Sequence, residues 1–192
     1  MTRVARLLPL VLLTGHVLAY GEWIVDDAGI VFAYARNWVE GLGLTAFPGD
    51  PPVEGFTSPL SVVLFAGLMK IGVFHTVWTP KVLGLLSMAG AFLLVRAAAR
   101  VSFPSAGRWI DIGLVFAALS PPLAIWASSG LENPLYALVV AMLLRWTVRP
   151  GPPGYRDAVV AGLLAGVIPL VRPDGCVYAA LWPRVVLTRP HA

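Results

Sequence analysis

Apolar segments alternate with short polar stretches along the whole chain, and the longest polar stretch lies near the amino terminus. That stretch runs from Trp23 to Leu60 and holds half of the ten acidic residues in the chain. Helices that cross a bilayer need about 20 mostly apolar residues. The alternation therefore predicts an all-α protein, a polytopic transmembrane helix bundle of five to six spans with an outer loop of amphipathic juxtamembrane helices. The apolar segments are Leu7 to Ala19, Leu60 to Phe74, Val82 to Val95, Ile110 to Ala127, Leu135 to Trp146, Ala158 to Val171 and, as a candidate last one, Cys176 to Leu187.

The composition supports membrane insertion rather than a soluble domain. The chain is 58% hydrophobic and 12% charged, with a mean hydropathy of +0.79, whereas soluble domains carry about 25% charged residues. A pI near 9.6 would suggest a nucleic acid partner if the protein were soluble. Here the arginines cluster at the ends of apolar segments as topology signals, so we expect no nucleic acid partner. The chain is predicted to form a single membrane domain over residues 1–192, and its one cysteine, Cys176, allows no internal disulfide.

The amino-terminal segment resembles a signal peptide, because Arg3 and Arg6 precede an apolar run and Val17-x-Ala19 fits a cleavage site. The apolar run continues past Glu22, however, and further apolar segments follow. We therefore favour an uncleaved first helix with its amino terminus in the cytoplasm. A secreted soluble domain behind a cleaved signal is the weaker alternative.

The distribution of arginines and acids predicts how the segments cross the membrane. Loops rich in arginine stay on the inner side, which places residues 96–108 inside and requires that Leu60 to Phe74 does not cross. Residues 21–75 then form the outer loop, and Leu60 to Phe74 either dips into the outer leaflet or packs there as a juxtamembrane helix. A full crossing, the alternative, would put residues 96–108 outside. The inner residues are Arg96, Arg100, Arg108, Asp111, Arg145, Arg149, Arg156, Asp157, Arg184 and Arg189, and the outer acids are Glu22, Asp26, Asp27, Glu40, Asp50, Glu54, Glu132 and Asp174.

Two local features are predicted within this topology. Asp27 to Glu40 should form an amphipathic helix lying flat at the membrane surface, ended by Gly41 and Gly43, with Tyr34 and Trp38 at headgroup depth. Pro121-Pro122 should kink the Ile110 to Ala127 helix in its outer half. The apolar face of the surface helix comprises Ile30, Val31, Tyr34, Ala35, Trp38 and Val39, and its polar face comprises Arg36, Asn37 and Glu40.

The acids on the outer side are the residues that could carry chemistry. Asp26 and Asp27 could form a helix N-cap with a first-turn acid, or one of them could act as a general base, and the pair alone favours the cap. Arg172 and Asp174 could satisfy each other in a turn, or Arg172 could hold a phosphate. Glu54 and Glu132 each have a simpler interpretation as loop or turn acids. Their convergence on one face above an apolar bundle suits a reaction on a lipid-borne substrate.

Several spaced sequence blocks run from Asp26-Asp27-Ala28 to Arg172-Pro173-Asp174-Gly175. Together they resemble membrane glycosyltransferases of the GT-C type, most closely the bacterial cell-wall arabinofuranosyltransferases and their uncharacterised relatives. The blocks occur in the right order from the amino terminus to about Gly175. Family members have more spans, so the resemblance covers the amino-terminal portion of a GT-C module and implies a carboxy-terminal half as a partner. The blocks are Asp26-Asp27-Ala28, Tyr34-Ala35-Arg36-Asn37, Gly41-Leu42-Gly43, Val53-Glu54-Gly55-Phe56-Thr57 and Pro59-Leu60 from the first outer loop, then Ser129-Gly130-Leu131-Glu132-Asn133-Pro134-Leu135-Tyr136 and Arg172-Pro173-Asp174-Gly175.

The resemblance implies a multi-pass enzyme of the cell membrane, active on the outer face. It would move a sugar from a polyprenyl-phosphate donor to a cell-envelope glycan or lipid acceptor, with membrane lipids around it. The family's catalytic acid matches Asp26 or Asp27, and we expect Asp26 to take the acceptor proton while Asp27 orients the acceptor or the loop. No cofactor is required, although a divalent cation is compatible with so many acids. The expected substrate-binding residues are Arg36, Lys81 and Arg172 for the donor phosphate, Glu54 and Glu132 for sugar or acceptor hydroxyls, and Asp174.

Two non-enzymatic alternatives stay open beside the glycosyltransferase interpretation. The chain could be an inactive fragment, or a non-catalytic membrane subunit, of such a system. It could also be a transporter, which should place ionisable residues within its spans. The ionisable residues lie mostly at segment ends, which argues against transport.

Overall fold

The computed structural model describes residues 3–188, and every regular element in this range is helical. The prediction of an all-α fold is therefore confirmed. Arg189, expected on the inner side, lies outside the described residues, as do the side chains of Arg3 and Arg6. The elements are α1 (Arg3–Ala19), α2 (Ala28–Val39), α3 (Pro59–Lys70), α4 (Trp78–Ser102), the short 3₁₀ helix η1 (Pro104–Ala106), α5 (Gly107–Leu119), α6 (Pro121–Ser128), α7 (Asn133–Thr147), α8 (Tyr155–Val171) and α9 (Gly175–Leu187).

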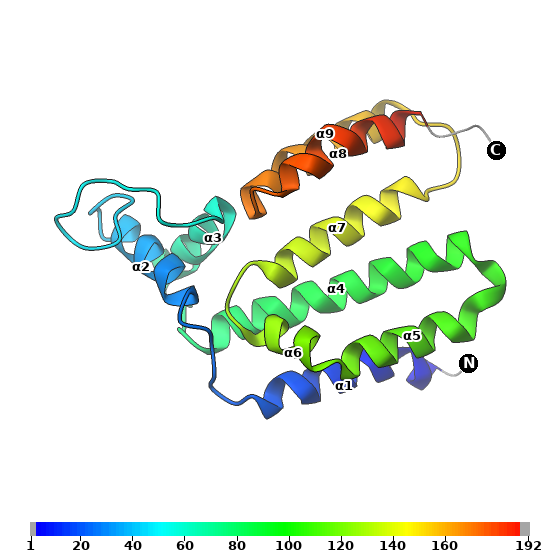
Figure 1. Cartoon of the computed structure of the whole chain (residues 1–192), viewed down its shortest axis with the longest axis horizontal. Coiled ribbons are helices and arrows are strands. Elements are labelled where there is room, and N and C mark those ends of the chain that lie inside the picture. The colour runs from blue at the N-terminus through cyan, green and yellow to red at the C-terminus, as the bar shows by residue number, and fades with distance from the viewer. Residues whose placement is uncertain (1–2, 189–192) are drawn as a thin grey trace.

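The helices form a bundle with a small lobe at one end (Figure 1). In the bundle, α4 packs against α7 and α6, α1 packs against α5, and α8 and α9 form a pair beside α7. The lobe consists of α2 and α3, which pack on each other, and α3 also touches α8. The 12-residue α3 covers most of the Leu60 to Phe74 segment, so this segment lies beside α2 and outside the bundle.

Local sequence signals set several helix ends. Gly41 and Gly43 adopt φ angles of 81° and 86° directly after α2, where a side chain would be strained, and they end the helix as predicted. Ser58 caps α3, because its hydroxyl accepts a hydrogen bond of 3.3 Å from the backbone N–H of Ser61. The kink predicted at Pro121 is also present, since α6 bends away from the preceding helix by 64°.

Two glycines allow neighbouring helices to approach closely. A Cβ atom on Gly84 of α4 would lie 2.1 Å from the carbonyl oxygen of Ala127, and one on Gly175 of α9 would lie 2.5 Å from that of Ile168. Both separations are shorter than atoms tolerate. Glycine at these two positions therefore sets the packing of α4 on α6 and of α9 on α8.

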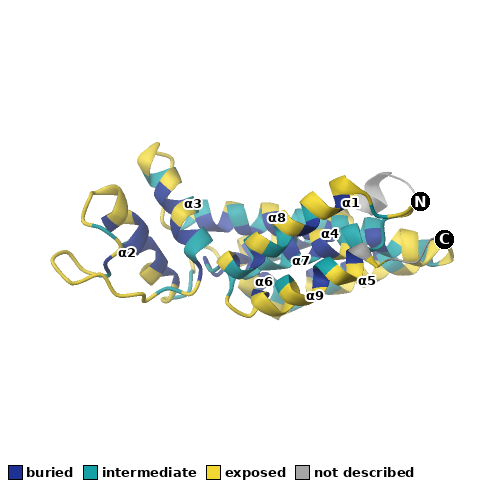
Figure 2. Cartoon of the chain, turned by 90° about the horizontal axis from the view of Figure 1, so that it is seen from above, coloured by how far each residue is buried: buried dark blue, intermediate teal, exposed yellow. Residues whose placement is uncertain are grey.

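Buried side chains form one core in the lobe and two in the bundle (Figure 2). The lobe core lies between α2 and α3, and the bundle cores lie among α1, α4, α5 and α6 and among α7, α8 and α9. Leu13 and Val17 of α1 are 1% and 0% exposed in the first of these bundle cores. The amino-terminal apolar segment is therefore part of the folded bundle.

The helices are shorter than the predicted spans. Among the described residues, α4 is the one helix long and apolar enough to cross a membrane, and the bent pair Pro104–Leu119 and Pro121–Ser128 adds a second if it forms one broken span. The prediction of five to six spans is not supported by these lengths. α7 and α8 have 15 and 17 residues, which corresponds to about 22 and 26 Å, whereas a bilayer's hydrocarbon core is about 30 Å thick.

The face of α2 that packs on α3 differs from the predicted apolar face. Ile30 and Trp38 are 43% and 44% exposed, whereas Asn37 is 1% exposed. Asn37 is buried because its amide donates hydrogen bonds of 2.8 and 3.1 Å to the carbonyl oxygens of Thr45 and Ala46 in the following loop. Tyr34 is 2% exposed and packs inside the lobe. Its hydroxyl donates a 2.6 Å hydrogen bond to the carbonyl oxygen of Val53, which holds the loop onto the lobe.

Candidate functional site

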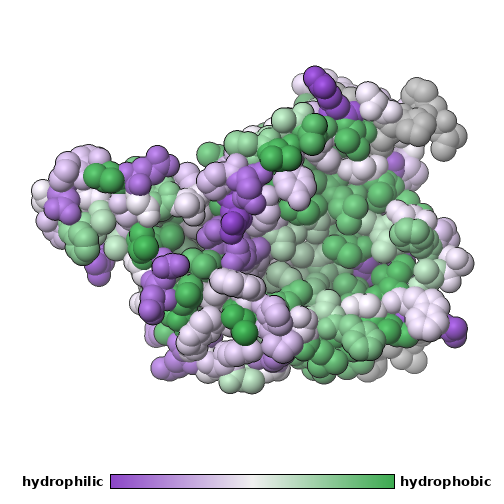
Figure 3. Space-filling view, in the orientation of Figure 1, coloured by the Kyte–Doolittle hydropathy of each residue, from purple (hydrophilic) through white to green (hydrophobic). Residues whose placement is uncertain are grey.

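Charged residues gather at both ends of the bundle, and we name the two ends by their dominant charge. The basic end contains the turns from α4 to α5 and from α7 to α8, and the acidic end is where the lobe joins the bundle (Figure 1). Hydrophobic residues cover much of the bundle face between them (Figure 3). Hydrophilic residues gather over the lobe and over its junction with the bundle.

The two acids at the basic end are paired with arginines. Asp111, whose side chain is 4% exposed, accepts hydrogen bonds from Arg96 and Arg100 at 3.1 and 3.3 Å. A second pair joins Arg149 to Asp157 at 3.9 Å. The prediction that these two acids lie beside arginine-bearing turns is therefore confirmed. The ion pairs at this end therefore hold consecutive parts of the bundle together.

Two contacts bring the first acidic block to the turn that precedes α7. The backbone N–H of Val25 donates a 2.9 Å hydrogen bond to the carbonyl oxygen of Ser129. Gly130, at a φ of 90°, lies so close to α2 that a Cβ atom there would be 3.0 Å from that of Ala28. The Asp26-Asp27 pair and Glu132 therefore lie at the same end of the bundle, which a shared site requires.

The carboxylates of Asp26 and Asp27 are exposed at the beginning of α2. Asp27 occupies the N-cap position, but its side chain makes no capping hydrogen bond. Neither residue forms an ion pair within the described part of the chain. The N-cap favoured from the sequence was therefore wrong for the side chains, and both carboxylates are exposed without a partner among the described residues.

Arg172 connects two turns at the acidic end. Its guanidinium donates hydrogen bonds to Glu132 at 3.1 Å, to Asn133 at 2.7 Å and to Asp174 at 3.2 Å. It also stands 5.7 Å from the ring centre of Tyr136. The mutual satisfaction of Arg172 and Asp174 is thus confirmed. Because two carboxylates share one guanidinium, this cluster ties the α8–α9 turn to the start of α7.

Lys81 is a buried cation at the same end. It lies in the first turn of α4, is 2% exposed, and its Nζ has no hydrogen-bond partner among the described residues. Its neighbours on the helix surface, Pro80 and Gly84, contact Gly130 and Ala127. Burying an unpaired ammonium costs several kcal/mol, so this position is suited to an anion that arrives from outside the chain.

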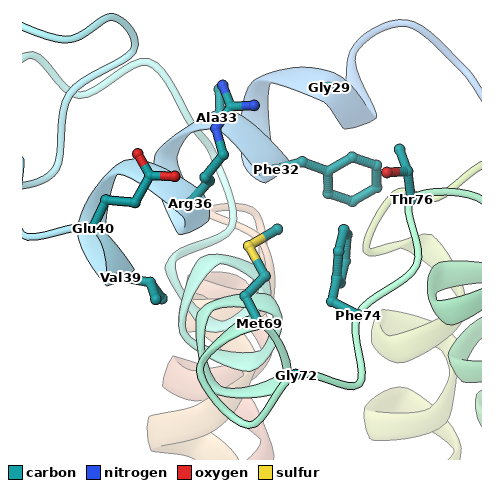
Figure 4. A pocket seen from close by; sticks show the side chains of 10 residues that line it. All are labelled: Gly29, Phe32, Ala33, Arg36, Val39, Glu40, Met69, Gly72, Phe74 and Thr76. Carbon is teal, nitrogen blue, oxygen red and sulfur yellow. The ribbon is translucent and has the colours of Figure 1, made fainter.

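The remaining predicted residues line separate hollows. Glu54 borders a groove of about 650 Å³ with Pro173 and Cys176, beside the α8–α9 turn. Glu132 borders a small cavity of about 90 Å³ between α3, α4 and α7. Arg36 lines a third groove, between α2 and the end of α3 (Figure 4). The structure therefore gathers the predicted site residues at one end of the molecule without placing them in one pocket.

A lateral groove in the bundle was not predicted. It has a volume of about 650 Å³, is lined by apolar residues of α4, α6 and α7 such as Met88, Leu123 and Trp126, and reaches Asn133 and Arg172 at the acidic end. No local pattern in the sequence marked it, because its lining residues come from several helices. An apolar groove with polar groups at one end suits a lipid with a polar head.

No group of three or more His, Cys, Asp or Glu side chains within residues 3–188 has the arrangement of a metal site. A comparison with protein-family models gave no match. Comparisons with curated proteins and with solved structures gave none either. The resemblance to GT-C glycosyltransferases therefore stays a prediction from the sequence blocks.

Proposed function

We propose that this chain forms all or part of a membrane glycosyltransferase that moves a sugar from a polyprenyl-phosphate donor to a cell-envelope glycan or lipid acceptor. The observation that carries the proposal is the juxtaposition at the acidic end. Two adjacent free carboxylates, Asp26 and Asp27, share this end with the buried unpaired Lys81 and with the apolar groove that reaches Arg172. This reaction needs a carboxylate that takes a proton, a cation that binds the phosphate and an apolar groove that holds the lipid tail.

Exposed apolar side chains support a membrane location for the bundle. Leu86, Phe116 and Leu163 are 64%, 71% and 64% exposed on three different helices, and monomeric soluble proteins rarely expose large contiguous apolar patches. Only 28% of the apolar window of α4 is buried, unlike the core helix of a soluble protein. We propose that the shorter helices of the bundle also cross, with local bilayer thinning making up the mismatch in length. The acidic end would then face outward.

The proposed chemistry uses few protein groups. In this proposal the donor tail lies in the lateral groove and its phosphate lies at the acidic end, where Lys81 and Arg172 supply positive charge. The acceptor oxygen forms a bond to the anomeric carbon while the bond from that carbon to the phosphate oxygen breaks, and the phosphate keeps the electron pair. Asp26 takes the proton of the acceptor hydroxyl, and Asp27 orients the acceptor. The phosphate leaves as a stable anion, so no strong general acid is needed.

The catalytic assignment is tested by transfer of a radiolabelled sugar from a polyprenyl-phosphate donor in membranes that contain the protein. Asp26→Asn should lower the rate by about 100-fold or more, because it removes the proton acceptor. Asp50→Asn, a change at another exposed acid of the same loop, is the matched control and should leave the rate unchanged. Unimpaired transfer by Asp26→Asn would remove this residue from the role.

A second candidate is a non-catalytic membrane subunit of the same kind of system. It is favoured by the distribution of the predicted residues over separate hollows and by the engagement of Arg172 with Glu132 and Asp174. If this chain is such a subunit, its variant with both Asp26 and Asp27 replaced by asparagine would still support sugar transfer by the catalytic partner. The double variant therefore separates the two candidates.

A further inference from the structure

The groove between α2 and α3 is the feature of the lobe that the proposed reaction does not use. It has a volume of about 550 Å³ and is formed by α2, the end of α3 and the loop that leads to α4 (Figure 4). Clefts of about 300–1,000 Å³ typically hold small ligands. One end of the groove is at Gly29, whose N–H donates a 2.9 Å hydrogen bond to the carbonyl oxygen of Asp26. This end of the groove is therefore one helical turn from Asp26 along the chain.

The floor of the groove is aromatic and fixed in place. Phe32, Phe65 and Phe74 form a cluster of edge-to-face contacts, with ring centres between 5.1 and 5.7 Å apart. Phe32 and Phe74 line the groove, and Met69 adds a thioether beside them (Figure 4). Such packing of aromatic rings holds their orientation without a ligand. The floor is thus a preformed apolar surface.

The loop that carries Phe74 is also held in place. The Nδ1 atom of His75 accepts hydrogen bonds of 3.3 Å from the backbone N–H groups of Val77 and Trp78. The N–H of His75 itself donates a 2.7 Å hydrogen bond to the hydroxyl of Thr79. These bonds fix the loop to the first turn of α4. A ligand in the groove would therefore not have to order the loop, which lowers the cost of binding.

The rim carries one unpaired donor group and one unpaired acceptor group. Arg36 and Glu40 lie one turn apart on α2, both exposed, and neither makes an ion pair or a side-chain hydrogen bond within the described residues. A guanidinium only donates hydrogen bonds and a carboxylate only accepts them. Their charges cancel, so the rim does not select an anion. It suits a neutral ligand whose groups both donate and accept.

From these features we infer that the groove binds a neutral saccharide, with the C–H face of a sugar ring on Phe74 and its hydroxyls at Arg36 and Glu40. Sugar hydroxyls donate to the carboxylate and accept from the guanidinium, and the ring C–H groups pack on the aromatic floor. The saccharide is the acceptor glycan, an assignment that rests on the proposed function. Its reacting hydroxyl would leave the groove at the Gly29 end, toward Asp26. Arg36 is thereby an acceptor-binding residue rather than a ligand of the donor phosphate.

Binding can be measured by saturation-transfer NMR on the protein in lipid nanodiscs, free of sugar-based detergents. The probes are a methyl pyranoside and a methyl furanoside, with glycerol phosphate as the anionic competitor. The blocking variant is Gly29→Trp, because Gly29 lines the groove and nothing lies within 4 Å of a Cβ atom at this position. The matched control is Gly67→Trp on α3, which has equal space but borders a different groove.

We expect Gly29→Trp and Glu40→Gln each to weaken binding of at least one glycoside by 10-fold or more, and Gly67→Trp to leave it unchanged. Glycerol phosphate should not compete. Unchanged binding by Gly29→Trp and Glu40→Gln, no binding of either glycoside to the native protein, or displacement of the glycoside by glycerol phosphate would overturn the saccharide site. Glycoside binding that is lost in Gly29→Trp, in a protein whose transfer is insensitive to Asp26→Asn, would support the site while contradicting the proposed catalytic role.

Discussion

The two ends of the bundle use charge in different ways. At the basic end Asp111 is buried and bound by Arg96 and Arg100, so its charge is fully engaged within the protein. At the acidic end Asp26 and Asp27 are exposed without partners, and Lys81 is buried without one among the described residues. Buried charges that are paired contribute to the structure, whereas unpaired ones have a cost that a ligand can offset. The comparison indicates that the charges of the basic end stabilise the fold, whereas those of the acidic end are available for binding and chemistry.

The largest expected effect is at the basic end. Asp111→Ala leaves two arginines without their shared carboxylate and should lower the free energy of unfolding by about 3–5 kcal/mol. Denaturant titration of the purified protein in micelles measures it. Asp50→Ala, at an exposed loop acid, should change the value by less than about 0.5 kcal/mol. Equal effects of the two changes would contradict a structural role for the Asp111 cluster.

A second effect concerns the packing of α4 on α6. Gly84→Ala places a methyl group against the carbonyl oxygen of Ala127 and should destabilise the protein by about 1–3 kcal/mol. Gly113→Ala in α5 meets nothing within 4 Å and should instead stabilise it by about 0.5–1 kcal/mol. Thermal unfolding of the two variants side by side gives the signs. Stabilisation of the protein by both changes would show that α4 and α6 are not in close contact.

Lys81→Met tests the acidic end, because it removes an unpaired buried charge, whereas Asp111→Ala leaves two arginines without their shared carboxylate. The variant should unfold at a higher temperature, with a gain of about 1 kcal/mol, since an unpaired buried ammonium is replaced by an apolar side chain of similar length. Sugar transfer should fall in the same variant. Lys70→Met, at an exposed lysine of α3, serves as the control. A marked loss of stability in Lys81→Met would mean that Lys81 has an anionic partner in the protein.

The smallest expected effect on stability is at the carboxylates proposed for chemistry. Asp27→Asn and Asp26→Asn should each change the free energy of unfolding by less than about 0.5 kcal/mol. A side-chain N-cap would contribute about 1 kcal/mol, and α2 has none from Asp27. Denaturant titration of both variants tests this point. A loss near 1 kcal/mol at Asp27 would restore the capping interpretation.

The existence and order of the helices followed from the sequence, because apolar segments and the Pro and Gly signals between them are local features. The kink at Pro121 and the end of α2 at Gly41 are of this kind. Whether a helix crosses a membrane did not follow as well, since most of the apolar segments are shorter than the roughly 20 residues that a span needs. The helix lengths do not support the predicted five to six spans.

The contacts of the candidate site could be predicted only in part. The distribution of charge predicted that Asp26 and Glu132 lie at the same end of the bundle. It did not predict the hydrogen bond between Arg172 and Glu132, which joins residues 40 positions apart. Asn37 is polar and was placed at the surface, yet it is buried because loop carbonyl groups need its amide as a donor. Such pairings depend on how distant segments meet, which periodicity alone does not encode.

The central claim, that the acidic end faces outward and the basic end faces the cytoplasm, can be tested with the single native cysteine. Cys176 is exposed at the start of α9, at the acidic end. In intact cells a membrane-impermeant maleimide should label it. In a Cys176→Ser variant that also carries Ser105→Cys at the basic end, labelling should require permeabilised cells. Labelling of position 105 in intact cells, with Cys176 protected, would contradict the account.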